Sequence, residues 1–295
     1  MNTNIETRVK QTLSKIKPRL NKKEKILVAL SGGIDSTIVA YLLKKLGYKI
    51  EGFHIDLGMG GYSERCLAAV KKLCKQLGIK LHLYDIKKEM GSSMCYIRAG
   101  IQQEKKGLKN CAICGVIKKW IMNKEARSIK GIRKIATGHN LDDEAQTFFM
   151  NILKGSLNLS ANSGASTKNI ADKKFTARIK PLFYVAENDI RTFSKKMKLP
   201  VVYEHCPCAI DSYRIQIRQF MNRLTTREKE NIMKNFDRLF PQIQKLKSKE
   251  QLKYCEICGE PSRNNICKMC QLVNVKKNST LLSTSLLWTT REIVR

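Results

Sequence analysis

A buried strand, a glycine-rich turn and a helix follow one another without interruption near the N-terminus, and this segment limits the folds open to the chain. Residues 25–30, KILVAL, form an apolar run of strand length, and the turn SGGIDS occupies 31–36. The next residues carry apolar side chains at helical spacing and end at Gly47. A strand that leads directly into a helix is typical of a parallel sheet with crossover helices.

The same alternation of strands and helices continues along the chain. Apolar runs predict further strands at 50–57, 80–86 and 133–139. Periodic segments predict helices at 62–77, 113–129, 141–153 and 187–197. The run KPLFYV at 180–185 opens the last part of the sheet domain. We therefore predict an α/β fold with a doubly wound parallel sheet, and a ligand at the carboxyl ends of its strands.

Changes in composition divide the chain into five predicted parts. They are a basic N-terminal helix at 1–24, the sheet domain at 25–210, a charged helical segment at 211–250, a cysteine module at 251–278 and a tail at 279–295. The Ser-, Asn- and Lys-rich loop 156–176 is either a surface insertion or a lid that substrate orders. We assign no role to the tail.

The charge balance points to a polyanionic partner. The 56 Lys and Arg residues outnumber the 25 Asp and Glu residues, which gives a formal net charge of +31. A Lys-rich surface that only aids solubility is the simpler reading, but an excess of this size favours nucleic acid because phosphate contacts release counterions. The charged N-terminus and the lack of a long apolar window predict no secretory signal, no membrane span and a cytoplasmic location.

The turn SGGIDS has the composition of a phosphate-binding loop. Backbone N–H groups at a helix N-terminus favour anions, and glycine allows phosphate to approach closely. A plain glycine-rich turn is the alternative, whereas a Walker loop is excluded because Gly-Lys-Ser/Thr is lacking. The turn resembles the PP-loop of ATP pyrophosphatases. That resemblance implies that Asp35 binds Mg²⁺. It also implies that the triphosphate of ATP is held by Ser31, Gly32, Gly33, Asp35 and Ser36.

A second motif, GHNLDDEA at 138–145, also lies where a strand meets a helix. Its acids could simply stabilise the helix N-terminus, whose partial charge favours carboxylates. Together with SGGIDS, however, the motif resembles the second nucleotide-site motif of tRNA-modifying PP-loop enzymes. The resemblance implies that Asp142 takes part in catalysis and that the nucleotide is bordered by Gly138, His139 and Asn140. His54 and Ile55 match the family's adenine site, although His54 could equally be a packed core residue.

Most of the cysteines fall into two groups. The chain has eleven cysteines, and in a protein predicted to be cytoplasmic this number favours metal or redox chemistry over disulfides. The terminal group consists of two CxxC pairs, Cys255 with Cys258 and Cys267 with Cys270. Four thiolates are typical of a structural zinc site, and a redox dithiol pair is the alternative.

The second group joins Cys111 and Cys114 to the distant Cys206. These three cysteines have four possible interpretations. They could bind zinc, hold an iron–sulfur cluster with one open iron, include a pair that passes a persulfide, or be three unrelated buried thiols. The remaining thiols beside apolar helix faces are predicted to be core residues, and these are Cys66, Cys74 and Cys95.

In chain order, these motifs resemble the TtuA-like group of tRNA 2-thiolation enzymes over roughly residues 5–275. The resemblance implies that Cys111, Cys114 and Cys206 hold a 4Fe-4S cluster whose open iron binds sulfide, and that Lys118 is catalytic. It implies tRNA as substrate, with free sulfide or a ubiquitin-like thiocarboxylate carrier protein as sulfur donor. We also consider a homodimer.

The implied reaction adenylylates the C2 oxygen of a tRNA uridine with ATP and then replaces that oxygen with sulfur. The alternatives are TtcA-like thiolation of cytidine, amidation as in TilS or GMP synthetase, and a catalytically silent zinc-bearing RNA-binding protein. Two departures from the family stand out. The chain has no cysteine before Cys66, so the N-terminal zinc finger of many members is not seen, and Cys208 is an extra thiol beside Cys206.

Overall fold

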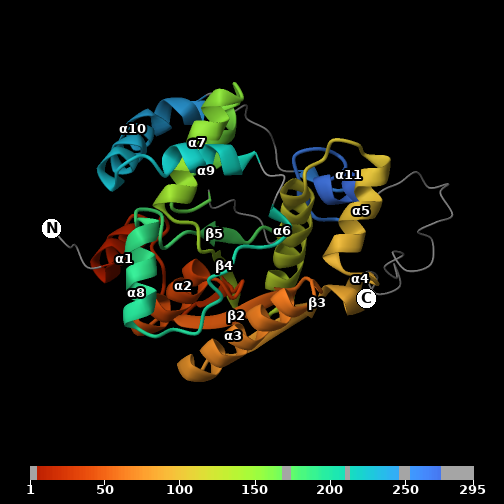
Figure 1. The fold of residues 1–295 in the computed structure, drawn as a ribbon, viewed down its shortest axis with the longest axis horizontal. Coiled ribbons are helices and arrows are strands. Elements are labelled where there is room, and N and C mark those ends of the chain that lie inside the picture. The colour runs from red at the N-terminus through yellow and green to blue at the C-terminus, as the bar shows by residue number, and fades with distance from the viewer. Residues whose placement is uncertain (1–4, 168–173, 210–212, 246–252, 274–295) are drawn as a thin grey trace.

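The computed structural model describes residues 5–167, 174–209, 213–245 and 253–273. Five parallel strands form one sheet in the order β3-β2-β1-β4-β5 (Figure 1). Their bounds are β1 Lys25–Ala29, β2 Lys49–Asp56, β3 Leu81–Asp85, β4 Ile132–Ala136 and β5 Ala177–Ile179. The sheet order and the parallel pairing confirm the predicted doubly wound α/β fold.

Helices cover both faces of this sheet. One face carries α1 (Ile5–Ser14), α2 (Ile34–Lys45), α3 (Gly61–Leu77) and α8 (Glu187–Lys196). The other carries α4 (Ile86–Met90), α5 (Met94–Glu104) and α6 (Asn110–Ser128). In β1, Ile26 and Val28 pack into the first core while Leu27 packs into the second. Because successive side chains of a strand point to opposite faces, this double burial explains the unbroken apolar run.

A third apolar core lies at one end of the sheet. It is formed by α7 (Leu141–Leu153), the short 3₁₀ helix η1 (Leu157–Asn162), α9 (Arg214–Met221) and α10 (Thr226–Lys245). The rings of Phe148 and Phe236 lie with their centroids 4.9 Å apart and join α7 to α10. Figure 1 shows these helices grouped together, away from the helices of the two sheet faces.

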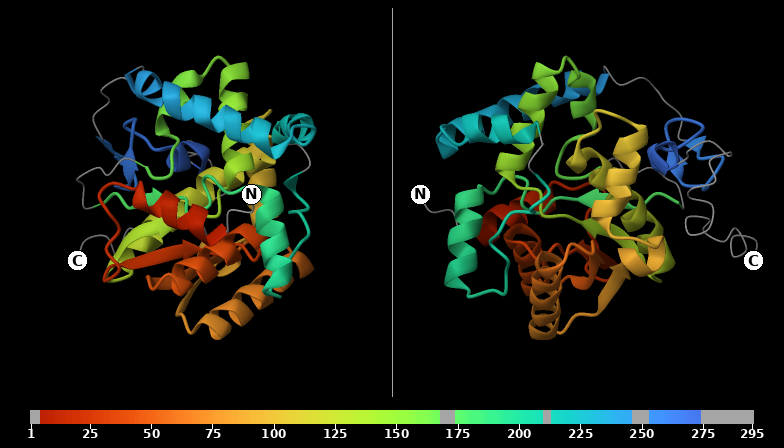
Figure 2. Two further views of the ribbon diagram at one scale, coloured as in Figure 1. Left: turned by 90° about the vertical axis from the view of Figure 1, so that its left-hand side faces the viewer. Right: turned by 45° about the vertical axis from the view of Figure 1, so that its right-hand side comes forward.

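The cysteine module contains β6 (Lys253–Tyr254), β7 (Pro261–Ser262) and α11 (Lys268–Val273). It packs against α6, and its buried Cys255, Cys267 and Met269 belong to the same apolar core as Ile113 and Ile117 of that helix. Figure 2 shows the module on the side of the molecule where α5 and α6 lie. The module is therefore seated on the sheet domain rather than tethered beside it.

Three local features differ from the sequence prediction. Helices α4 and α5 fill a stretch for which no element was predicted. Strand β5 precedes the run at 180–185, whose central residues form turns. Part of the 156–176 loop forms η1, while residues 168–173 and the tail at 279–295 lie outside the described residues. Among the described helices, none has the length and apolarity to span a bilayer.

Candidate active site

The SGGIDS turn lies between the end of β1 and the start of α2, as predicted. The N–H of Ser31 donates to Oγ of Ser36 over 3.1 Å, and that hydroxyl lies 3.1 Å from the carbonyl oxygen of Gly33, to which it donates. Gly33 is the N-cap of α2, and no side chain caps this helix. The N–H groups of the first turn are therefore available to an anion, as a triphosphate site requires.

Two glycines allow three chain segments to meet at this turn. Gly32 has φ of +85°, and a Cβ there would lie 2.8 Å from Cα of Cys66. A Cβ on Gly138 would lie 2.8 Å from the backbone nitrogen of Ser36. Since contacts under 3.0 Å are not sustained by real side chains, both positions require glycine. The two motifs are thus in direct backbone contact.

Asn140 links the two motifs through its side chain. Its Nδ2 donates to Oδ1 of Asp35 over 3.0 Å, and its Oδ1 accepts from the N–H of Asp143 as the N-cap of α7. Burial raises the pKa of Asp35 to about 6, the Asn140 hydrogen bond opposes that rise, and the nearby carboxylates of Asp143 and Glu187 add to it. A carboxyl crowded by other acids is suited to bind a divalent cation.

Of the two predicted histidines, His54 at the end of β2 is buried, whereas His139 just after β4 is exposed. Nδ1 of His54 lies 2.7 Å from the carbonyl oxygen of Leu30, so this nitrogen carries the proton and Nε2 is an acceptor. Nε2 is buried and has no hydrogen-bond partner. Burial lowers the pKa of His54, while partial loss of solvation and the charge of Lys180 lower the pKa of the exposed His139. A neutral His54 with an unpartnered acceptor fits the amino group of adenine, and Ile55 beside it is half-buried.

The adjacent acids Asp142 and Asp143 have different surroundings. Asp142 is buried, and its two oxygens accept from Nζ of Lys229 and from the N–H of Glu187, each over 2.7 Å. Oδ1 of Asp143 lies 3.1 Å from Nη1 of Arg214. The carboxylate of Asp143 rather than that of Asp142 acts on the pKa of Asp35. Asp142 therefore joins α7 to α8 and α10, whereas Asp143 pairs with Arg214 of α9 and its charge acts on Asp35.

Sequence reasoning did not identify a group of cations beside these acids. Burial lowers the pKa of Lys119, and the neighbouring charges of Arg178, Lys180 and Arg214 lower it further. These residues come from α6, from β5 and the turn after it, and from α9. No local pattern could reveal the group, because only the fold brings the three segments together. Such a concentration of positive charge is suited to phosphate.

A polar cavity of about 480 Å³ adjoins Asp142. Its lining includes Arg191 of α8, His205, and Arg218 of α9. His205 directly precedes Cys206, so the cavity and the distant thiol lie on the same chain segment. This cavity is polar and flanked by cations, and it therefore suits part of a nucleotide better than an apolar ligand.

Of the three predicted cluster thiols, Cys114 is a charge neighbour of Cys206, and Cys111 lies one helical turn before Cys114. Cys111 is exposed in the first turn of α6, and Cys114 follows on the same face of the helix. Burial raises the pKa of the half-buried Cys206, while the nearby Lys118 ammonium lowers it and Cys114 is a further charge neighbour. Within the described ranges these three sulfurs do not form a group with ligand atoms within 4.8 Å of one another. Three thiolates are a donor set that both zinc sites and iron–sulfur clusters use.

The segment that carries Cys206 is tied to the nucleotide end. The N–H of Val202 donates to the carbonyl oxygen of Gly32 over 2.8 Å, and Arg65 forms a 2.5 Å ion pair with Glu204. The first of these bonds connects the PP-loop itself to the thiol-bearing loop. The candidate nucleotide loop and the loop that carries Cys206 are therefore adjacent.

The predicted core role holds for two of the three remaining thiols. Cys66 and Cys74 are buried, at 3% and 4% exposed. Cys95 is only half-buried, and its Sγ lies 3.8 Å from Sγ of Cys208. The prediction that Cys95 is a core residue is wrong, because the start of α5 turns this side chain toward the 206–208 loop instead of the apolar core.

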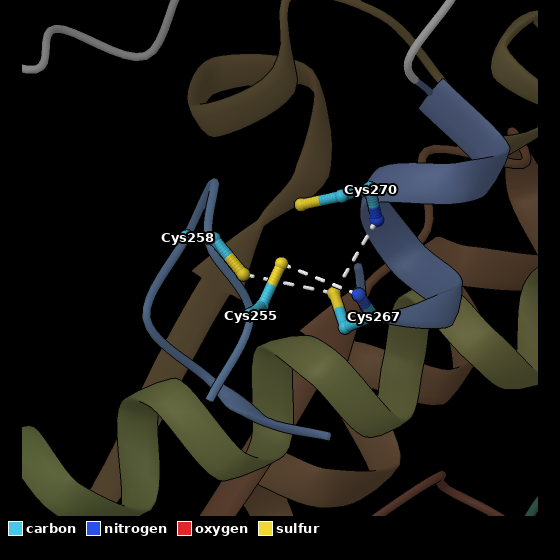
Figure 3. A group of neighbouring side chains, drawn as sticks. All are labelled: Cys255, Cys258, Cys267 and Cys270. Carbon is cyan, nitrogen blue, oxygen red and sulfur yellow. Dashed lines mark hydrogen bonds between the residues drawn. The ribbon is translucent and has the colours of Figure 1, made fainter. Parts of the chain in front are cut away.

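The terminal cysteines form a compact group. The Sγ atoms of Cys255, Cys258, Cys267 and Cys270 all lie within 4.8 Å of one another (Figure 3). Sγ of Cys267 lies 3.6 Å from Sγ of Cys258, and the N–H of Cys267 donates to Sγ of Cys255 over 3.2 Å. Four converging thiols with backbone donors aimed at sulfur fit a tetrahedral metal site.

Comparison with known proteins agrees with this geometry. The model of a family described as a PP-loop domain matches residues 1–224. The tRNA-5-methyluridine(54) 2-sulfurtransferase of Pyrococcus horikoshii is 38% identical over 277 residues, which cover 92% of this chain and 86% of the relative. The cytoplasmic tRNA 2-thiolation protein 1 of Saccharomyces cerevisiae is 32% identical over 269 residues, 85% of this chain and 72% of the relative.

A solved structure extends the likeness to three dimensions. It is that of the U34-tRNA thiolase NcsA from Methanococcus maripaludis with its 4Fe-4S cluster. The two folds agree with a TM-score of 0.74 at 26% identity, over 93% of this chain and 89% of the other. The chain belongs to the PP-loop family and, within it, to the TtuA-like group of tRNA 2-thiolation proteins.

Proposed function

We propose that this protein is an ATP-dependent tRNA-uridine 2-sulfurtransferase. It adenylylates the C2 oxygen of a uridine, with loss of pyrophosphate, and sulfur then displaces AMP from the same carbon. The observation that carries the proposal is the 2.8 Å hydrogen bond from Val202 to Gly32, which joins the candidate nucleotide loop to the candidate thiol loop. Activation and sulfur transfer act on one carbon atom, so they require both sites in one cleft.

The nucleotide end supplies the groups for adenylyl transfer. The uncapped N–H groups of α2, with Ser31, Gly32, Gly33 and Ser36, bind the triphosphate, while Gly138 and His139 border it. Asp35, held by Asn140, binds Mg²⁺, and the acceptor nitrogen of His54 receives the adenine amino group beside Ile55. Asp142 contributes by fixing the start of α7, which carries Asn140 and Asp143 into place.

The thiol end supplies the sulfur. Cys111, Cys114 and Cys206 hold a 4Fe-4S cluster with one open position, and Lys118 lies beside Cys206. When bound, the cluster supplies an iron that accepts sulfide. The Lys118 ammonium stabilises negative charge on the incoming sulfur and on the oxygen under attack. Sulfide itself or a ubiquitin-like thiocarboxylate carrier protein is the donor.

The terminal cysteines hold one Zn²⁺ with a structural role. Four ligands leave no open position on a tetrahedral ion. Because the module packs on α6, the zinc stabilises the helix that presents Cys111 and Cys114. The two metal centres then have separate tasks, although they share one helix.

Transfer RNA binds chiefly through its phosphates. The formal charge of +31, the cations around Lys119 and the polar cavity near His205 support this partner, and the cavity is suited to receive an everted uridine. With six to ten phosphate contacts, affinity falls by about 10³–10⁵ between about 50 and about 200 mM salt. The protein acts in the cytoplasm, as a monomer or a homodimer.

The test is the replacement of Asp35. In Asp35→Ala, pyrophosphate release that depends on tRNA falls to about one hundredth or less, while the circular dichroism spectrum is unchanged. The matched control is Asp189→Ala, which removes an exposed carboxylate from α8 and retains full turnover. Turnover in Asp35→Ala at the wild-type rate rules the proposal out.

A further inference from the structure

Two thiols outside both cysteine groups lie in contact beside the candidate cluster ligands. Sγ of Cys95, at the start of α5, is 3.8 Å from Sγ of Cys208, which follows Cys206 by two residues. Sγ of Cys208 is also 3.8 Å from Sδ of Met59. Both cysteines are half-buried, so a small molecule can reach them. Three sulfur atoms from distant segments thus gather at this point.

A buried cation accompanies the pair. Arg98 lies one turn after Cys95 in α5, is 7% exposed, and its Nε donates to the carbonyl oxygen of Met94 over 3.3 Å. Burial and the contact with Cys208 raise the pKa of Cys95, and the positive charge of Arg98 opposes that rise. A buried guanidinium beside two sulfurs stabilises an anionic sulfur species, because a buried charge requires a partner of opposite sign.

The proposed reaction sets the chemistry that such a pair can perform. Uridine thiolation consumes sulfide, whereas persulfides carry sulfur at a higher oxidation level. Reduction of a persulfide's outer sulfur to sulfide requires two electrons, and two adjacent thiols supply two electrons when they join as a disulfide. A dithiol beside the sulfide-consuming site can therefore make sulfide where it is used.

We propose that Cys95 and Cys208 form a persulfide-reducing dithiol, an inference that rests on the proposed function. The Cys208 thiolate attacks the outer sulfur of a low-molecular-weight persulfide, the S–S bond of the donor breaks, and the donor leaves as a thiol. Cys208 then carries the transferred sulfur as its own persulfide. The Cys95 thiolate attacks Sγ of Cys208, forms the Cys95–Cys208 disulfide and expels hydrosulfide beside Cys206. A cellular dithiol reduces the disulfide and restores both thiols.

The test uses the protein loaded with cluster and zinc, free of air and reductant, with cysteine persulfide as the probe. Wild-type protein releases one sulfide per chain and then stops, and peptide mass spectrometry finds Cys95 joined to Cys208. Dithiothreitol restarts the release. Cys95→Ser lowers the release by about tenfold or more and retains one extra sulfur atom on Cys208. Cys208→Ser gains no extra sulfur atom at Cys95, and its sulfide release falls by the same factor.

Cys74→Ser is the matched control, since it removes a buried thiol from α3 and leaves the release unchanged. Visible absorbance shows that each variant still holds its cluster. Release at the wild-type rate in Cys95→Ser, or a persulfide on another cysteine, overturns the proposal. The release assay needs neither ATP nor tRNA, so its outcome is read separately from that of uridine thiolation. A disulfide that forms with oxidants but never with persulfide would identify a redox switch and also overturn the proposal.

Discussion

The two main cysteine groups differ in how firmly the fold holds them. Three of the four terminal cysteines are at most 7% exposed, and all four sulfurs lie within 4.8 Å of one another. In the other group, Cys111 is exposed while Cys114 and Cys206 are half-buried. A structural metal site is closed around its ion, whereas a site that exchanges sulfur must leave a position that substrate can reach. The contrast in burial is therefore the one expected if the terminal group is the stabilising site that we propose and the other group is the reactive one.

The largest expected effect concerns the reactive group. Cys114→Ser should remove the brown colour and lower thiolation by about 10³-fold or more, because the cluster loses a ligand. The free energy of unfolding should change little, since this thiol is only half-buried. Visible absorbance, nucleoside analysis and urea denaturation measure the three quantities, with Cys74→Ser as the control. Full activity in a colourless Cys114→Ser protein would contradict both the cluster and a persulfide pair that uses Cys114.

The terminal group should respond in the opposite way. Cys267→Ser should lower the free energy of unfolding by more than about 4 kcal/mol, because it removes a ligand from the metal that holds the module together. Protein that remains folded at low temperature should keep its brown colour. Metal analysis and urea denaturation check both statements. One zinc ion per chain in a variant that has serine at all four terminal cysteine positions would show that the ion is bound elsewhere.

A smaller effect tests whether the two groups communicate through α6. Arg127, near the end of α6, pairs with the buried Glu260 of the module, and one of its bonds to that carboxylate is 2.7 Å long. Arg127→Leu should lower the free energy of unfolding by about 2 kcal/mol, because it leaves a buried carboxylate unpaired. Arg127→Lys should recover part of that loss. Cluster content should stay within about twofold of wild type. An unchanged unfolding curve for Arg127→Leu would show that the module is not anchored through this pair.

The sequence was sufficient for features that depend on neighbouring residues. The strand-turn-helix around SGGIDS and the helix that begins within GHNLDDEA are local patterns, and the structure confirms both elements. Helix α4 was missed although a local signal exists, since Asp85 caps its start by accepting from the N–H groups of Lys87 and Lys88. The helix is only five residues long, which is too short for a periodic apolar pattern to be seen.

Features that depend on contacts between residues far apart in the chain could not be predicted from the sequence. The pairing of Asp142 with Lys229 spans 87 positions, and that of Cys95 with Cys208 spans 113. Sequence alone could not show that Asp142 is held by other elements while Asp143 acts on Asp35. A lone cysteine near an apolar helix face resembles a core residue, so Cys95 was misplaced. Only the packing of α5 against the 206–208 loop reveals its partner.

The central claim is that the two ends of one cleft convert uridine to 2-thiouridine. The direct measurement is mass spectrometry of nucleosides from unmodified tRNA incubated without air with cluster-loaded protein, ATP, Mg²⁺ and sulfide. The account predicts 2-thiouridine, formed in proportion to AMP, and none when ATP is omitted or when Asp35→Ala replaces the wild-type protein. Thiolated cytidine, or tRNA that stays free of sulfur while the cluster is intact and ATP is present, would contradict it.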